Sequence, residues 1–279
     1  MNSSQPTTRR SPVAIVIVAA LFVAVPLMTW EQTWFGRKLT DAQMRSYLED
    51  ERHPRHMQHA LSQISDRILQ GDATVRQWYP QVAALAHCGN GAVRVTAAWV
   101  LGQDNTSSLF HQTLQSLLQD PEPMVRRNAA LALVRFQDPS GRPELRSMLN
   151  PYTFRSPVSG RIAVSVIPNE RIGSGTLLAR VTPKEGRPHE IRSAFAGKVG
   201  RFLPPHSSWV SEGEGILSMD SAEEQIWEAL RGLYLIGRSE DLDVVQRYAT
   251  AGNLSDSVRQ QAELTAHAIR ARSEPIPIR

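Results

Sequence analysis

Three histidines have the residue type and spacing that come closest to a reactive site. In the stretch HPRHMQH, His53, His56 and His59 follow one another at intervals of three residues, at the expected start of a helix. Imidazole nitrogens are common zinc ligands, so such a cluster could bind a metal. Neighbouring members share a helix face, but the outer pair diverges by about 120° around the helix axis. We therefore interpret the histidines as an exposed helix start and expect no metal.

No other stretch matches a familiar catalytic motif. The chain lacks Gly-x-Ser-x-Gly, Walker and His-Glu-x-x-His sequences. Its glycine-rich stretches at 173–175 and 212–215 do not open a helix after a strand, as a phosphate-binding loop does, so we interpret them as turns. The single cysteine, Cys88, excludes an internal disulfide and a multi-cysteine metal site. We expect a protein that is not an enzyme and that carries no cofactor.

The overall charge argues against a nucleic-acid partner. The net charge of +4 is spread over 279 residues and forms no basic stripe.

The elements around these residues begin with a helical repeat. AVRVTAAWVLG (92–102) and MVRRNAALALVRF (124–136) share a Val-Arg pair that is followed, after two residues, by an Ala pair. SVRQQAELTAHAIR (257–270) repeats the Val-Arg pair with Ala262 in register, and 223–237 is a looser copy. Stacked helix pairs with small inner residues are typical of an α-solenoid. The residues expected to pack the repeats are Val93, Arg94, Val125, Arg126, Val258 and Arg259.

We expect these valines to insert into the neighbouring layer and the arginines to pair with acids at the turns between repeats, such as Asp120. The pattern resembles HEAT repeats, specifically the short HEAT-like repeats of the phycobilisome-lyase type, over residues 50–150 and 221–273. The resemblance implies a fold and is nearly silent on function, and we do not carry over lyase activity.

A duplicated β pattern interrupts the helical sequence. SPVSGRI (156–162) matches SAFAGKV (193–199), and RIGSGTLLARV (171–181) matches WVSEGEGILSM (209–219). Two copies of strand, glycine turn and strand predict a small sandwich with approximate twofold symmetry. The glycines expected at sharp turns and strand junctions are Gly160, Gly175, Gly197 and Gly213.

Residues 151–220 resemble the biotinyl/lipoyl domain, or barrel-sandwich hybrid, which also occurs in the periplasmic adaptor (membrane fusion) proteins of efflux and secretion systems. The resemblance implies a carrier lysine at the hairpin between the halves, where VTPKEGRPHEI offers only Lys184. Pro183, Glu185 and the extra loop residues depart from the carrier pattern, so we interpret Lys184 as an unmodified loop residue. The long helical hairpin of the adaptor proteins is also missing from this position.

The N-terminal sequence predicts a membrane anchor. Residues 12–30 hold no charge and, as a helix, span about 28 Å, close to the hydrocarbon thickness of a bilayer. No small-x-small cleavage site follows, which favours an anchor over a signal peptide. Arg9 and Arg10 favour an N-terminus inside the cell. We expect a disordered tail at 1–11, a juxtamembrane segment at 31–49 and a tail at 274–279.

The sequence therefore predicts an α+β multidomain protein: one transmembrane helix, then an α-solenoid with an inserted barrel-sandwich module. We expect a single-pass protein of the bacterial inner membrane with a periplasmic bulk. Its expected function is that of a scaffold or adaptor that binds other envelope proteins, as an accessory part of an efflux or secretion system. Two alternatives remain open: a carrier domain that uses Lys184 for an enzyme complex, and a membrane-bound enzyme with its site in the solenoid groove.

Overall fold

The computed structural model describes residues 38–205, 207–252 and 254–273. The expected tails at 1–11 and 274–279 and the expected anchor at 12–30 lie outside these residues. None of the described helices is both long enough and apolar enough to cross a membrane. Contacts divide the chain into two compact units, Met1–Gln63 and Ile64–Arg279.

In the first unit, helix α2 (Asp41–Leu48) precedes the start of α3 (Pro54–Leu69). A capping box begins α2: Thr40 Oγ1 accepts from the Gln43 N–H at 3.3 Å, and Gln43 Oε1 accepts from the Thr40 N–H at 3.1 Å. Proline starts α3, where its missing N–H costs no helical hydrogen bond. A tight turn at 49–53 joins the two helices.

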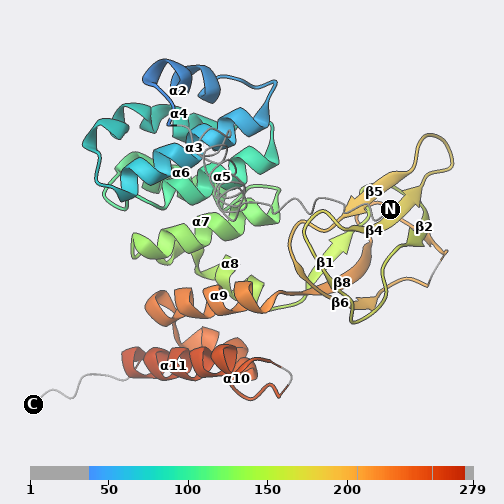
Figure 1. The fold of residues 1–279 in the computed structure, drawn as a ribbon. Coiled ribbons are helices and arrows are strands. Elements are labelled where there is room, and N and C mark those ends of the chain that lie inside the picture. The colour runs from blue at the N-terminus through green and yellow to red at the C-terminus, as the bar shows by residue number, and fades with distance from the viewer. Residues whose placement is uncertain (1–37, 206, 253, 274–279) are drawn as a thin grey trace, which may run out of the picture. The chain divides into compact units, whose positions relative to one another are not determined.

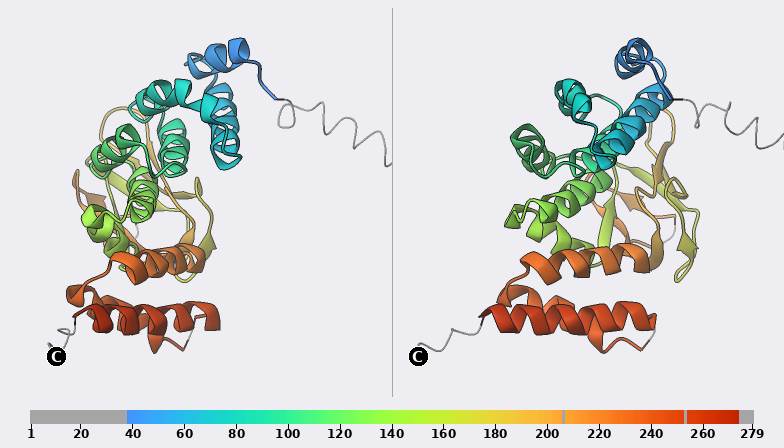
Figure 2. Two further views of the ribbon diagram at one scale, coloured as in Figure 1. Left: turned by 90° about the vertical axis from the view of Figure 1, so that its left-hand side faces the viewer. Right: turned by 60° about the vertical axis from the view of Figure 1, so that its left-hand side comes forward.

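In the second unit, successive helices stack on one another (Figures 1 and 2). Before the β module these are η1 (Ala73–Trp78), α4 (Tyr79–Leu85), α5 (Gly91–Leu101), α6 (Ser108–Leu117), α7 (Pro123–Arg135), η2 (Pro139–Gly141) and α8 (Arg142–Met148). After it come α9 (Glu223–Ile236), η3 (Ser239–Asp241), α10 (Leu242–Ala249) and α11 (Asp256–Ser273). Helices α8 and α9, on either side of the β module, pack together in one buried core.

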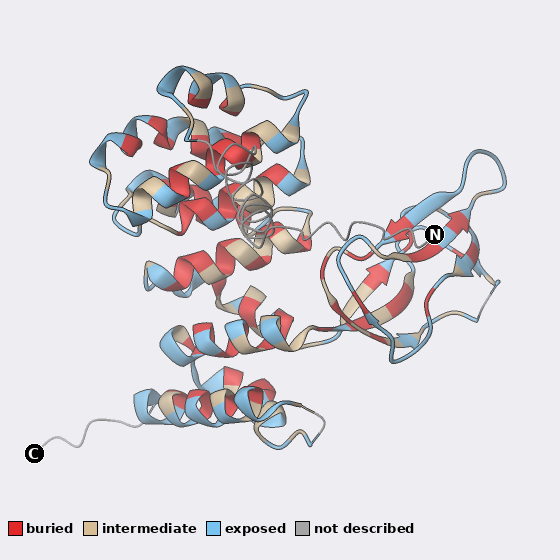
Figure 3. Ribbon diagram, viewed as in Figure 1, coloured by how far each residue is buried: buried red, intermediate tan, exposed pale blue. Residues whose placement is uncertain are grey.

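The repeated Val-Arg pair has the same role in each copy. Val93, Val125 and Val258 are fully buried (Figure 3). Arg94 donates to the carbonyls of Cys88 and Gly89, six and five residues earlier, and Arg126 donates to those of Asp120 and Pro121 at the same offsets. Arg259 likewise donates to the Leu254 carbonyl at 2.9 Å. Each arginine thus satisfies carbonyl groups of the loop that leads into its own helix.

The acids that meet these arginines differ from copy to copy. Arg94 forms a bidentate pair with Asp120, at 2.7 and 2.9 Å. Arg126 instead reaches Glu144 at 3.2 Å, and Arg259 pairs with Asp256. Only the first pair therefore links one inter-repeat loop to the next in the expected way.

Between α8 and α9 the chain forms two four-stranded antiparallel sheets, in the orders β1-β8-β6-β3 and β5-β4-β2-β7. The strands are β1 (Tyr152–Arg155), β2 (Gly160–Val164), β3 (Arg171–Ile172), β4 (Leu177–Thr182), β5 (His189–Arg192), β6 (Gly197–Phe202), β7 (Trp209–Val210) and β8 (Gly215–Ser221). Strands β1 to β4 are equivalent to β5 to β8, and each strand of one sheet has its equivalent at the same place in the other sheet. This confirms the expected twofold arrangement. Among the described strands, the two sheets stay separate and are not hydrogen-bonded into a closed barrel. Strands β3 and β7 are two residues long and pair only with β6 and β2.

The two halves of the β module repeat their hydrogen bonds as well as their strands. The buried Ser156 hydroxyl donates to the Val158 carbonyl at 2.6 Å, and the buried Ser193 hydroxyl donates to the Phe195 carbonyl at 2.5 Å. The N–H groups of Gly213 and Gly175 donate to the carbonyls of these same serines. Both glycines have φ near +80°, a conformation that only glycine adopts at little cost.

Gly160 and Gly197 occupy the other equivalent pair of positions. A Cβ on Gly160 would lie 2.5 Å from the Thr182 carbonyl oxygen, and one on Gly197 would collide with the Asp220 carbonyl oxygen. These residues are therefore glycines because a neighbouring strand passes too close for any side chain.

The core of the β module comes mostly from its own strands (Figure 3). Val164 is half-buried, and the buried residues of this core include Ile162, Val166, Leu178, Val181, Val199, Ile216 and Leu217. Met124 of α7, outside the module, also packs against this core.

A buried arginine joins the helices to the β module. Arg127 of α7 is 2% exposed, and its guanidinium lies 3.6 Å from the centre of the Phe195 ring in the loop before β6. Its Nη1 donates to Gln225 Oε1 of α9 at 2.5 Å, while its Nε has no hydrogen-bond acceptor among the described residues. Burial lowers the pKa of Arg127 to about 10, so the side chain remains charged at neutral pH. One side chain thus contacts α7, α9 and the module.

We predict that Arg127→Ala lowers the free energy of unfolding by about 2–4 kcal/mol, because it leaves a cavity over Phe195 and an unpaired Gln225. Urea unfolding followed by circular dichroism measures the change. Arg201→Ala, on an exposed position of β6, is the matched control and should change stability by less than about 0.5 kcal/mol. Equal changes in the free energy of unfolding for the two variants would show that the contacts of Arg127 do not stabilise the protein more than those of an exposed arginine.

Candidate functional site

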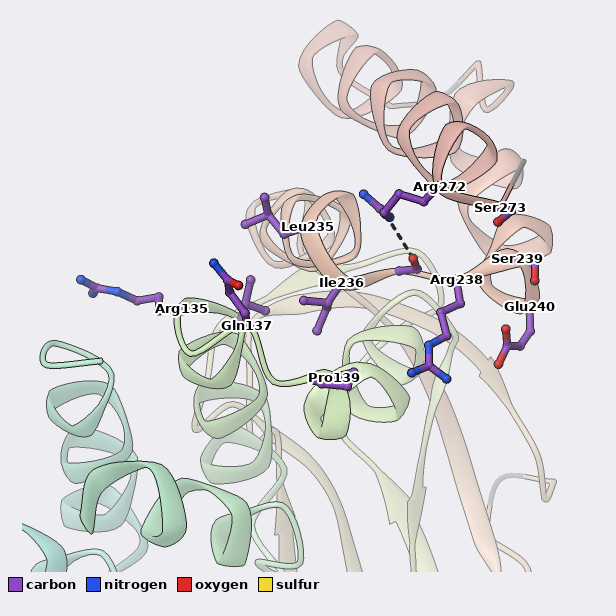
Figure 4. A pocket seen from close by; sticks show the side chains of 12 residues that line it. Arg135, Gln137, Pro139, Leu235, Ile236, Arg238, Ser239, Glu240, Arg272 and Ser273 are labelled. Atoms are coloured by element: carbon purple, nitrogen blue, oxygen red, sulfur yellow. Dashed lines mark hydrogen bonds between the residues drawn. The ribbon is translucent and has the colours of Figure 1, made fainter. Parts of the chain in front are cut away.

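A groove of about 840 Å³ runs along the ends of several repeat helices (Figure 4). Its apolar lining includes Val134 at the end of α7, Pro139 of η2, and Leu235 and Ile236 at the end of α9. Leu235 is 60% exposed, so its side chain is open to solvent at the groove. The polar lining consists of Arg135, Gln137, Arg238, Ser239, Glu240, Arg272 and Ser273.

The charges of the groove are unbalanced. Among its lining residues, Arg135, Arg238 and Arg272 face a single acid, Glu240. Glu240 is already bound to Arg142 of α8, whose Nη2 donates to Glu240 Oε1 at 2.8 Å. This hydrogen bond lowers the pKa of Glu240, so its carboxylate is ionised and its charge is compensated at neutral pH. Within the described part of the chain, the three lining arginines form no ion pair with a carboxylate.

Hydrogen bonds to neighbouring helices fix the positions of two of these arginines. Arg272, in the last turn of α11, donates to the carbonyls of Tyr234 at 2.7 Å and Gly237 at 3.1 Å, and so caps the end of α9. Arg135 donates to Gln103 Oε1 at 2.9 Å. Arg238 forms no ion pair within the described residues, and its side chain points along the groove beside Pro139 (Figure 4).

The turn below the groove depends on two residues. Gln137 ends α7 in the left-handed conformation, with φ of 57°. Asp138 follows it and accepts hydrogen bonds from the Ser140 N–H at 2.8 Å, from His111 Nε2 at 2.7 Å and from Gln115 Nε2 at 2.8 Å. These contacts tie the groove turn to the preceding repeat.

The lining of the groove has features that suit it to binding a ligand. Its lining contains neither histidine nor cysteine, so Ser239 and Ser273 have no neighbouring base that could activate them. Exposed apolar side chains beside uncompensated guanidinium groups match a ligand that carries both carboxylates and an apolar anchor.

A second cavity of about 600 Å³ lies where α9 and α10 meet the β module. Its charges are mixed: Arg171, Lys198 and Arg247 alternate with Asp220, Glu223 and Glu224. It therefore shows no preference for a partner of one sign.

Lys184 lies in the turn between β4 and β5, at residues 183–188, as the resemblance to carrier domains implies. Its Nζ is 5.7 Å from the centre of the half-exposed Trp209 ring. Cys88 is half-buried, and its Sγ lies 3.6 Å from the Asn90 carbonyl oxygen.

In the first unit, the structure separates the three histidines of the HPRHMQH stretch. His53 and His56 lie beside Asp50, whereas His59 is buried and lies 3.0 Å from Gln63 Nε2. Hydrogen bonds from His56 and, to a lesser extent, His53 lower the pKa of Asp50. Sequence analysis missed Asp50, although its spacing of three residues before His53 repeats the spacing of the histidines.

Comparison with known proteins supports the repeat assignment for part of the chain. Residues 80–155 match the HEAT repeats. No curated protein matches the chain. A solved structure described as "Structure and function of a single-chain, multi-domain long-chain acyl-coa carboxylase" is 16% identical, with a TM-score of 0.24. The match covers 44% of this chain and 10% of that chain, and a likeness this low supports no argument about fold or activity.

We predict that Asp138→Asn destabilises the protein by about 1 kcal/mol at neutral pH. Burial opposes ionisation of Asp138, but the hydrogen bonds from Ser140, His111 and Gln115 outweigh it and lower the pKa to about 2. Because the unfolded pKa is about 4, the stabilisation is complete above that pH and is lost as the pH falls towards 2.

Thermal melting between neutral pH and acid measures this contribution. The variant should lose less stability than the natural protein between pH values of about 4 and 2. Glu263→Gln, on the exposed face of α11, is the control and should leave the acid dependence unchanged. Parallel curves for Asp138→Asn and the natural protein would contradict the assignment.

Proposed function

We propose that this protein is a non-enzymatic scaffold that binds a partner protein in the groove between α7, α9 and α11. The observation that carries the proposal is the group of three arginines, without ion pairs in the described part of the chain, beside the exposed Leu235. Helical repeat arrays of this kind present extended surfaces for protein partners, and residues 80–155 match such repeats.

The proposed occupant is an acidic segment of the partner with at least one large apolar side chain. Acidic groups on that segment would pair with Arg135 and Arg238, while its apolar side chain would cover Leu235 and Ile236. Arg272 contributes charge, but most of its hydrogen-bonding capacity is used in capping α9. Pairs between arginine and carboxylate at the edge of such a groove favour specificity and fast association.

We further propose that the helices before and after the β module form one solenoid of HEAT-like repeats, of the phycobilisome-lyase type but without that activity. The β module is proposed to be a biotinyl/lipoyl-like barrel-sandwich hybrid, related to that of periplasmic adaptor proteins. Supporting this, its strands follow a duplicated order and its lysine-bearing turn joins the two halves.

Attachment to the bacterial inner membrane through residues 12–30, with a periplasmic bulk, and an accessory role in efflux or secretion remain part of the proposal. The uncharged length of that segment supports them. The full chain should stay in membranes washed with alkaline carbonate, and external protease should digest its bulk in spheroplasts. Release by carbonate or protection from the protease would contradict this attachment or orientation.

A defined peptide tests the groove. We expect a short fluorescent peptide with alternating glutamate and leucine to bind the full chain about tenfold more tightly than the same peptide with lysine in place of glutamate. Fluorescence anisotropy measures both affinities, and added salt should weaken the acidic peptide's binding.

Charge reversal locates the binding. Arg135→Glu and Arg238→Glu should each abolish the preference for the acidic peptide, because each replaces an attractive charge in the groove with a repulsive one. Arg201→Glu, on exposed β6, makes the same change of charge elsewhere and should preserve the preference. An equal loss with Arg201→Glu would mean that only the net charge matters, and the groove would not be the site.

A second candidate function rests on the position of Lys184 at the turn between the halves of the β module. In this alternative, Lys184 carries biotin or a lipoyl group for an enzyme complex. The intact mass of the natively expressed protein distinguishes the two functions. An added cofactor mass that disappears in Lys184→Arg would favour the carrier, and an unmodified mass would exclude it.

A further inference from the structure

We propose that Asp50, His53 and His56 form a site for a divalent transition-metal ion, with Zn²⁺ as the preferred ion. One ligand atom from each residue lies within 4.8 Å of the ligand atoms of the other two. The site belongs wholly to the first unit and does not depend on the proposed groove.

The donor atoms already converge on one point. Asp50 Oδ2 lies 2.9 Å from His53 Nδ1 and 2.6 Å from His56 Nδ1. Donors in a tetrahedral zinc site, at about 2.0–2.2 Å from the ion, are about 3.3 Å apart. The Asp50 oxygen would therefore need to move by only about 0.5 Å from each imidazole nitrogen, and the two nitrogens already lie within 4.8 Å of each other.

The local backbone explains why these side chains meet. In the turn between α2 and α3, the His53 N–H donates to the Asp50 carbonyl at 3.1 Å, and the His56 N–H donates to the His53 carbonyl at 2.8 Å. This winding places residues 50, 53 and 56 on one side of the turn. The His56 ring also stacks on Tyr47 of α2, with centroids 4.4 Å apart and planes 8° apart, which fixes the plane of its imidazole.

The chemistry of the donor set selects the ion. Two imidazole nitrogens and one carboxylate oxygen are ligands that zinc accepts, and they leave a fourth position for water or another ligand. The His53 side chain is 63% exposed, so an ion can reach the site from solvent. Binding would replace the hydrogen bonds between the carboxylate and the imidazoles, and a neutral imidazole bound through Nδ1 would carry its proton on Nε2.

The competing explanation is that the carboxylate and the imidazoles only hydrogen-bond to one another at a helix start. Zinc titration of the full-length protein separates the two explanations. The protein is purified in mild detergent with a tag that contains no histidine, and is stripped of metal with a chelator. We expect isothermal titration calorimetry to show one tight Zn²⁺ per chain, and Co²⁺ to give the visible absorption of a low-coordinate site.

Single substitutions assign the ligands. Asp50→Asn and His56→Gln should each lose the tight Zn²⁺, and zinc should raise the melting temperature of the natural protein but not of these variants. His53→Gln changes the most exposed of the three residues and should lose the ion without affecting folding. His267→Gln, on an exposed position of α11, is the control and should bind Zn²⁺ as the natural protein does.

Absence of a tight Zn²⁺ in the natural protein would overturn the proposal. So would Zn²⁺ uptake that His53→Gln leaves unchanged in a folded chain, as judged by its circular dichroism. Loss of the ion in His267→Gln would place the metal elsewhere and would equally contradict the site.

Discussion

The guanidinium of Arg127 is a cation held in the interior without an ion pair to any described carboxylate, and the relation between the helices and the β module depends on it. Removing such a charge from water is costly, and its partners here are an aromatic face and an amide oxygen. Phe195 lies in the middle of the insertion, between β5 and β6, whereas Gln225 lies after the insertion, in α9. The charge is therefore satisfied only when the module has folded and α9 has packed in place. A lysine here would lose both the flat stacking surface and the directed N–H groups.

Away from this junction, the same set of contacts stabilises the helical repeats in each copy of the Val-Arg pair. Each Val-Arg pair buries the valine and uses the arginine to satisfy carbonyls in the loop that leads into its helix. Acidic residues also join loops to a neighbouring repeat: Asp120 binds Arg94, and Asp138 binds His111 and Gln115 of the preceding repeat. The groove forms where this pattern changes: Leu235 is left exposed, and three arginines share the lining with a single acid, Glu240, which is already paired with Arg142.

Features that repeat along the chain could be predicted from the sequence, whereas contacts that occur once, between segments far apart in the sequence, could not. The Val-Arg copies and the two Ser-x-x-x-Gly copies predicted the stacked helices and the duplicated strand order, because each is seen more than once. The open edges of the two sheets depend on strands as short as Arg171–Ile172, whose pairing no short pattern defines.

In the sequence, Arg127 looks like an ordinary polar position of an amphipathic helix. The groove unites residues 134–139 with 235–240 and 272–273, and no local signal relates those segments. Asp50 could have been predicted, because it precedes His53 by three residues, the same interval that separates the histidines.

The pairing of β1 with β8 has a mechanical consequence. Tyr152 lies opposite Met219, and the Ser221 hydroxyl donates to the Met148 carbonyl at 3.0 Å, so the chain leaves α8 and returns to α9 at nearly the same place. Tension applied along the helical array would pass from α8 to α9 through this pair of adjacent strands and the helix packing beside it. The remaining six strands would carry almost none of that load. The module hangs from the array as a side branch, and a pull that stretches the repeats would leave the turn bearing Lys184 and Trp209 undeformed.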